Sequence, residues 1–124
     1  MRTKICRNSG FTLVEIMIVV AIIGILAATM TRNFVQARET SQLTAIVSNL
    51  RTIENAKNQW AIEARKGTGA TPTTANLADY LKGQTMPSTV VGEIYNINAV
   101  GTLPTATTPV KLGTYSPNSQ ITVP

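Results

Sequence analysis

The first pattern along the chain is an apolar run from Phe11 to Met30, which contains one charged residue, Glu15. Twenty residues at 1.5 Å per residue would span about 30 Å, the hydrocarbon thickness of a bilayer. A chain of 124 residues rarely has a core large enough to surround such a segment on all sides. The pattern therefore predicts a transmembrane helix over residues 11–30.

The second pattern is an apolar stripe with spacings of three and four residues, typical of an amphipathic helix. No glycine or proline lies between Gly24 and Gly67. We therefore expect one continuous helix over residues 11–66, with residues 31–66 as its amphipathic continuation and Gly67 as its C-terminal stop. Trp60 is expected in the core. The stripe consists of Leu43, Ile46, Val47, Leu50, Ile53, Ala56, Trp60 and Ala64.

Residues 67–124 have a different composition, with all six prolines and many threonines. Thr74 is expected to cap a short helix over residues 75–82. The alternation over residues 93–98 predicts a strand, residues 110–112 and 121–123 are weaker strand candidates, and the Thr-rich tract 102–109 is interpreted as a polar loop. The expected fold class is α+β, with a small antiparallel sheet of two to four strands packed on the C-terminal half of the helix.

The charge is concentrated at the N-terminus. The segment before the apolar run contains three basic residues, Arg2, Lys4 and Arg7, and no acidic residue. The rest of the chain contains the other eight of the eleven basic residues and all six acidic residues. The positive-inside rule places residues 1–10 in the cytoplasm and the part after Arg32 on the other side of the membrane. No basic stripe with interleaved aromatics follows, which argues against nucleic-acid binding.

The composition excludes most catalytic chemistry. The chain has no histidine and one cysteine, Cys6, so His-based triads, Cys-cluster zinc sites and an intrachain disulfide are excluded. No nucleophile–base pair or phosphate-binding Gly-rich loop is present, and no cofactor is expected. After Lys66 the only acids are Asp79 and Glu93, too few for a calcium site. We expect a protein that is not an enzyme.

Glu15 requires an explanation, because a carboxylate in an apolar membrane segment is costly. An ordinary signal peptide gains nothing from it, and the apolar run is also longer than the about 7–15 residues of such peptides. If the chain began at Phe11, a free amine would lie one turn before Glu15, and the positive helix end would face the carboxylate. The alternative is that Glu15 lies at headgroup depth beside Arg7.

The segment from Gly10 to Glu15 (GFTLVE), with a basic leader before it and an apolar helix after it, resembles the class III leader of type IV prepilins and type II secretion pseudopilins. The resemblance implies that a prepilin peptidase cuts after Gly10 and that the new Phe11 amine is N-methylated. It also implies that Glu15 pairs with the Phe11 amine of a neighbouring subunit, that the fold is pilin-like, and that assembly platform proteins act as partners. The helices would bundle in a filament core, where the small residues Ala21, Gly24 and Ala28 allow close packing.

Two features depart from the resemblance. Arg32 occupies the place where the family often has a proline, so no kink is expected there. The C-terminal disulfide of many type IV pilins is also absent.

We expect a type II secretion pseudopilin in a bacterial inner membrane, with its C-terminal domain in the periplasm. The alternatives are a type IV pilin, major or minor, and a single-span anchored interaction protein without a filament role.

Overall fold

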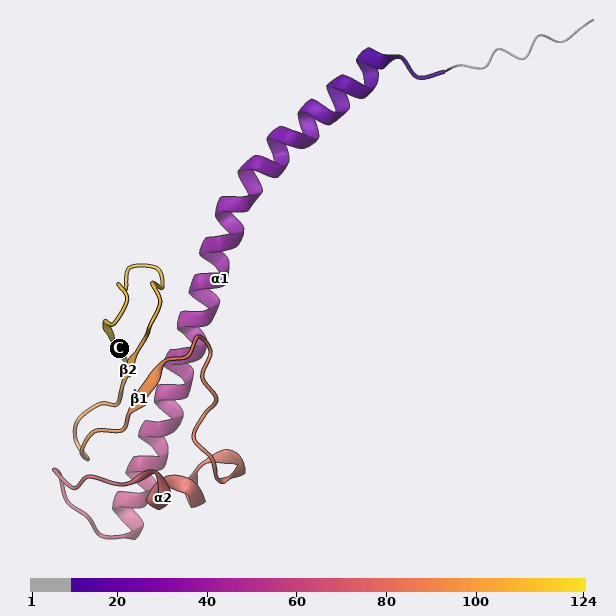
Figure 1. Ribbon diagram of the computed structural model, residues 1–124. Helices are drawn as coiled ribbons and strands as arrows, with labels where there is room; N and C mark the ends of the chain where they lie inside the picture. Colours follow the sequence, from indigo (N-terminus) through magenta and orange to yellow (C-terminus); the bar gives the residue numbers. More distant parts are fainter. Residues whose placement is uncertain (1–9) are drawn as a thin grey trace, which may run out of the picture. The chain divides into compact units, whose positions relative to one another are not determined.

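The computed structural model describes residues 10–124, so the expectations for the leader residues Arg2, Lys4, Cys6 and Arg7 lie outside the described residues. The chain divides into two units, one that ends at Val35 and one that comprises Gln36–Pro124 (Figure 1). The expected α+β class is confirmed: one long helix is followed by a small three-stranded antiparallel sheet. The elements are α1 (Leu13–Glu63), α2 (Thr74–Leu77), the 3-10 turns η1 (Ala78–Tyr80) and η2 (Lys82–Gln84), and the strands β1 (Ile94–Asn96), β2 (Thr105–Thr107) and β3 (Gln120–Thr122).

Helix α1 ends before the predicted stop. Its last turn closes through hydrogen bonds from the Lys66 amide to the Ala61 carbonyl (2.8 Å) and from the Arg65 amide to the Ile62 carbonyl (3.3 Å). This is a Schellman motif, and the residue in the left-handed conformation is Arg65, with φ of +50°. The prediction that Gly67 stops the helix is therefore wrong, because the motif turns the chain two residues earlier.

The apolar stripe of α1 divides its buried residues between two core clusters. Ile46 and Leu50 pack with Ala106, Leu112 and Ile121 of the C-terminal region. Further along the helix, Ile53 and Ala56 pack with Leu77 and Leu81, and Trp60 covers this second cluster from its edge. The stripe is thus confirmed as the core face, except that Ala64 is exposed.

The sheet has the strand order β1-β2-β3, and both pairs are antiparallel. Ala106 of β2 lies opposite Tyr95 and Ile121, and the buried Ala106 and Ile121 face the helix. The prediction of a polar loop over residues 102–109 is wrong, because Ala106 supplies a small buried position between two threonines that point away from the core. Residues 110–112 form only an isolated bridge, between Leu112 and Tyr115.

The short helix begins one residue earlier than predicted and is interrupted. Thr73 is the N-cap, and it forms a capping box with Asn76. Leu81 adopts extended backbone angles and Gly83 has φ of +78°, so the segment beyond Leu77 continues as 3-10 turns. Leu77 and Leu81 both reach the core in this way.

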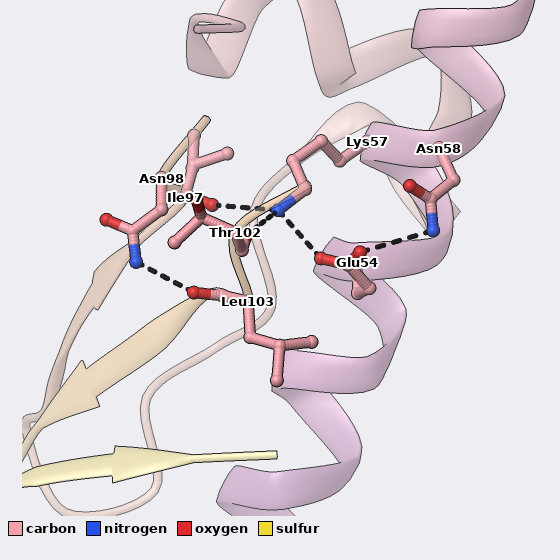
Figure 2. A network of polar contacts seen from close by, with 7 residues as sticks. All are labelled: Glu54, Lys57, Asn58, Ile97, Asn98, Thr102 and Leu103. Atoms are coloured by element: carbon pink, nitrogen blue, oxygen red, sulfur yellow. Dashed lines mark hydrogen bonds and ion pairs between the residues drawn. The ribbon is translucent and has the colours of Figure 1, made fainter. Parts of the chain in front are cut away.

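A fully buried lysine joins α1 to the loop between β1 and β2. Lys57 has no exposed surface, and its ammonium forms an ion pair with Glu54 at 2.7 Å. The same ammonium donates to the carbonyls of Ile97, at 3.4 Å, and Thr102 (Figure 2). An ammonium that is buried in this way is tolerated in a core because it has three oxygen partners, and the apolar stripe gave no sign of it.

A second buried charge lies beside β1. The Glu93 carboxylate accepts hydrogen bonds from the amides of Val90 (2.9 Å) and Val91 (2.8 Å) and from the Tyr95 hydroxyl. Asn49 of α1 donates to the Tyr95 oxygen at 2.8 Å. Burial alone would raise the pKa of Glu93, but these donors outweigh it, and the pKa lies below its ordinary value.

Candidate processing and assembly site

The expected cleavage junction precedes the helix. Gly10 and Phe11 are exposed and lie in irregular backbone, since α1 begins only at Leu13. An exposed, non-helical segment is the conformation in which peptide bonds are most accessible to proteolysis. The structure is compatible with a cut at this peptide bond, and the cleavage and the N-methylation of Phe11 stay predictions.

Glu15 forms a capping box with Thr12 at the start of α1. The Thr12 amide and hydroxyl donate to Glu15 Oε2 at 3.0 and 3.2 Å, and the Glu15 amide donates to the Thr12 hydroxyl at 3.2 Å. The Thr-x-x-Glu pattern that signals this arrangement is visible in the sequence, but sequence reasoning missed it by searching only for a charged partner. Glu15 therefore has a local role in helix initiation besides the intermolecular one expected of it.

Neither proposed charged partner of Glu15 is tested by this geometry. Arg7, the partner in the alternative interpretation, lies outside the described residues. The free Phe11 amine would exist only after the cut, and the one that pairs with Glu15 would belong to another copy. The Glu15–Phe11 ion pair stays a prediction.

The apolar part of α1 is not covered by any of residues 10–124. Every residue from Gly10 to Arg38 is exposed, and the helix is long and apolar enough to cross a membrane. Near the end of the run, the hydroxyls of Thr29 and Thr31 donate to the carbonyls of Leu26 (2.9 Å) and Ala27 (3.1 Å), which satisfies them within the helix. This surface suits membrane anchoring, because it needs apolar surroundings that the described residues do not provide.

The predicted packing patch also lies in this uncovered part. Apart from its chain neighbours and the backbone of its own helix turns, a Cβ atom added to Gly24 would meet no atom of the described residues within 4 Å. The close approach that Ala21, Gly24 and Ala28 would allow therefore has to come from another helix, and it stays a prediction.

No metal-ligand cluster is found in the described part of the chain, where no three His, Cys, Asp or Glu residues gather. Asp79 and Glu93, the two acids after Lys66, differ in environment: Asp79 is exposed, and Glu93 is buried with its own donors.

The exposed apolar N-terminal helix, its capped start and the small antiparallel sheet define a pilin-like α+β protein. Residues 5–31 match the family model described as the prokaryotic N-terminal methylation motif. The chain thus carries the prepilin-type motif that the sequence resemblance indicated, and this expectation is confirmed.

Curated relatives share this part of the chain. The type IV major pilin protein PilA of Myxococcus xanthus is 46% identical over 57 residues, which are 46% of this chain and 26% of that protein. The type II secretion system core protein G of Aeromonas hydrophila is 37% identical over 57 residues, 40% of its length. The core protein G of Vibrio cholerae is 33% identical over 60 residues, 48% of this chain and 41% of the relative. The matches therefore cover between a quarter and two fifths of these relatives. No solved structure matches the chain significantly.

Proposed function

We propose that this chain is a structural subunit of a pilin-like filament, of the pseudopilin class that serves type II secretion, and not an enzyme. The observation that carries the proposal is the methylation motif at the start of an apolar helix that nothing in the described chain covers. Such a helix needs one apolar environment before assembly and another afterwards. A bilayer supplies the first, and a bundle of identical helices supplies the second.

The proposed sequence of events follows from the residues at the helix start. The subunit is anchored in the inner membrane with residues 1–10 in the cytoplasm and the C-terminal unit in the periplasm. A prepilin peptidase cuts after Gly10, Phe11 is N-methylated, and assembly platform proteins move the subunit into the filament. Glu15 then pairs with the Phe11 amine of a neighbouring copy, which compensates both charges in an apolar core.

Intact-mass and N-terminal analysis of the protein from membranes tests the proposal. We expect a mature chain that begins at methylated Phe11. A Gly10→Val variant provides the matched control, since it alters only the residue before the cut and should accumulate with its leader attached. A wild-type chain that keeps its leader, or begins after Ala28, would contradict the proposal and favour the anchored interaction protein.

A type IV pilin is the second candidate, favoured by the 46% identity with the pilin of Myxococcus xanthus. The two candidates share the processing steps, so the N-terminal analysis does not separate them. Deletion of the gene, with secreted proteins and surface filaments assayed separately, does. Lost secretion with intact surface filaments supports the pseudopilin, and the opposite result supports the pilin.

A further inference from the structure

Two hollows lie on different sides of α1 within the unit Gln36–Pro124. The first, of about 400 Å³, is lined by α1 alone and contains Leu43, Val47 and Arg51. We call it the Arg51 hollow. The second, of about 370 Å³, lies between the end of α1 and the α2–η1 segment. It contains Trp60, Glu63, Asp79 and Tyr80, and we call it the Asp79 hollow.

The two hollows face nearly opposite directions. An α-helix turns by about 100° per residue, so Arg51 and Trp60, nine positions apart in the sequence, point about 180° away from each other. Parallel copies placed side by side present opposite sides to one another. The Arg51 hollow of one copy therefore faces the Asp79 hollow of the next.

The chemistry of the two hollows is complementary. Arg51 is exposed, and the one ion pair among residues 10–124 is Lys57–Glu54, so the Arg51 guanidinium is not in an ion pair with any described residue. On the other side, Asp79 is exposed, and Glu63 accepts a hydrogen bond from Tyr80 at 2.6 Å. Carboxylates beside aromatic rings are the surroundings that a guanidinium prefers.

We infer that the Arg51 hollow of one copy docks on the Asp79 hollow of a neighbouring parallel copy, with the guanidinium between Asp79 and Glu63 and against Trp60. The inference rests on the proposed function, because it assigns a lateral contact between filament subunits. A second copy is the fitting partner, since both complementary surfaces belong to the same chain. A contact between two different surfaces is heterologous and repeats without closing unless the rotation forms a ring, as a filament requires. Arg51 and Trp60 are nine positions apart in the sequence, so neighbouring copies would be displaced by about 14 Å along the helix axis.

Charge reversal tests the contact in cells that express one variant as the only copy. We expect Arg51→Glu and Asp79→Arg each to reduce the yield of sheared filaments by about tenfold, because like charges then meet across the contact. The double variant should recover at least about a third of the wild-type yield, because the pair is restored with its sign exchanged. Lys111→Glu, which reverses an exposed cation outside both hollows, is the matched control and should assemble normally. Full assembly of either single variant, or a double variant no better than the singles, would overturn the inference.

Cysteine crosslinking shows the contact directly. In a Cys6→Ser background, Ser48→Cys and Ala75→Cys place one thiol at each hollow, at residues that are exposed in the single chain. Mixed expression should give Ser48–Ala75 dimers, whereas each variant alone should give few. Dimers through two identical positions would indicate a symmetric contact and overturn the inference.

Different results would contradict the proposed function and the docking contact. If the wild-type chain is not processed at Phe11 and forms no filament, the proposed function fails. If processing and filaments are normal in the wild type but the charge reversals have no effect, the proposed function stands and only the docking contact fails.

Discussion

The two units of the chain use the same helix in opposite ways. Up to Val35, α1 exposes every apolar side chain, and the side chains of Glu15, Thr29 and Thr31 form hydrogen bonds within the first turns or back to the helix. From Gln36 onward, the helix buries one stripe under a sheet and admits a lysine into the core with a full set of oxygen partners. The C-terminal unit therefore buries its apolar stripe within its own fold, whereas the described apolar residues up to Val35 have no covering partner among residues 10–124.

The largest expected effect is on the buried lysine. Lys57→Met keeps the length of the side chain but leaves the Glu54 charge and the carbonyls of Ile97 and Thr102 without their cation. We expect the free energy of unfolding of the C-terminal unit to fall by about 3 kcal/mol, the range for one broken member of a buried pair. Urea unfolding of the full chain in detergent micelles, followed by Trp60 fluorescence, measures it. Lys66→Met removes an exposed cation as the control, and equal stability of both variants would contradict the prediction.

A matched pair of apolar truncations compares the two units directly. Leu50→Ala removes a buried side chain, and we expect a loss of about 3 kcal/mol in the same unfolding measurement. Ile22→Ala removes a side chain that is 53% exposed in the single chain, and the unfolding of the C-terminal unit should not change. Instead, the membrane-bound or assembled fraction should decrease. A clear loss of domain stability in Ile22→Ala would show that the two units are not independent.

The Glu15 series separates helix capping from intermolecular charge pairing. Glu15→Gln keeps a capping acceptor but removes the charge, whereas Thr12→Ala removes the capping hydroxyl and keeps the charge. We expect Glu15→Gln and Glu15→Ala to be inserted and cut normally and yet to give few filaments, because the amine in the apolar core loses its counter-charge.

Thr12→Ala is the control for the Glu15 series, and it should assemble, with a helix start weakened by about 1 kcal/mol. Sheared-filament yield reports assembly, and crosslinking of membrane-resident chains reports insertion. Normal filaments from Glu15→Gln would assign Glu15 to helix initiation alone.

The stability of the C-terminal unit is expected to depend on pH through Glu93 and Tyr95. Because the pKa of Glu93 is lower in the folded chain, its stabilising contribution is present above the ordinary carboxyl pKa and is lost as the pH falls through the lowered value. Burial and the hydrogen bond to Glu93 raise the pKa of Tyr95 to about 12, so a second loss occurs as the pH rises from about 10 to that value.

Tyr95→Phe isolates this network. It removes one donor from the buried Glu93 and should cost about 1–2 kcal/mol at neutral pH. The part of the alkaline loss of stability that Tyr95 causes should disappear with it, while the acid loss should move toward higher pH. Chemical denaturation at a series of pH values measures both changes, and Tyr115→Phe is the control. An unchanged alkaline limb in Tyr95→Phe would contradict the assignment.

The smallest effect is expected at the end of α1. Arg65 adopts a left-handed conformation that glycine accepts without strain, so Arg65→Gly should stabilise the C-terminal unit by up to about 1 kcal/mol. Lys66→Gly is the control and should be neutral or destabilising, because φ of Lys66 is not positive. A scan of thermal unfolding midpoints measures both. Destabilisation by Arg65→Gly would mean that the arginine side chain, and not the backbone, holds this turn.

The long-range features of the fold could be predicted where the sequence pattern is periodic. The stripe through Ile46, Leu50 and Ile53 indicated the core face, and the alternation around Tyr95 indicated β1. Strand β2 was missed, because its one buried residue, Ala106, gives almost no hydrophobic signal among threonines. Lys57 was missed for a different reason: its partners are backbone carbonyls some 40 residues away in the sequence, which no local pattern reveals.

In the candidate site, too, some features could be predicted from a sequence pattern and others depend on the folded structure. The apolar helix was predicted from the length of the apolar run and is confirmed, whereas the cut at Gly10–Phe11 stays a prediction that the match to the methylation motif supports. The role of Thr12 was readable and was overlooked. The surfaces around Arg51 and Asp79 could not be derived from the sequence, because the position of Asp79 depends on where the interrupted α2–η1 segment folds back against the end of α1.

The cap at the start of α1 uses only one of the two carboxylate oxygens of Glu15. Both hydrogen bonds from Thr12 end on Oε2, and Oε1 accepts none from residues 10–124. The lone pairs of Oε1 are therefore available to an incoming amine while the first turn stays wound. If the proposed pairing with a Phe11 amine forms, helix initiation and subunit recognition use different oxygens of Glu15, and the first turn of α1 can stay helical while the amine binds.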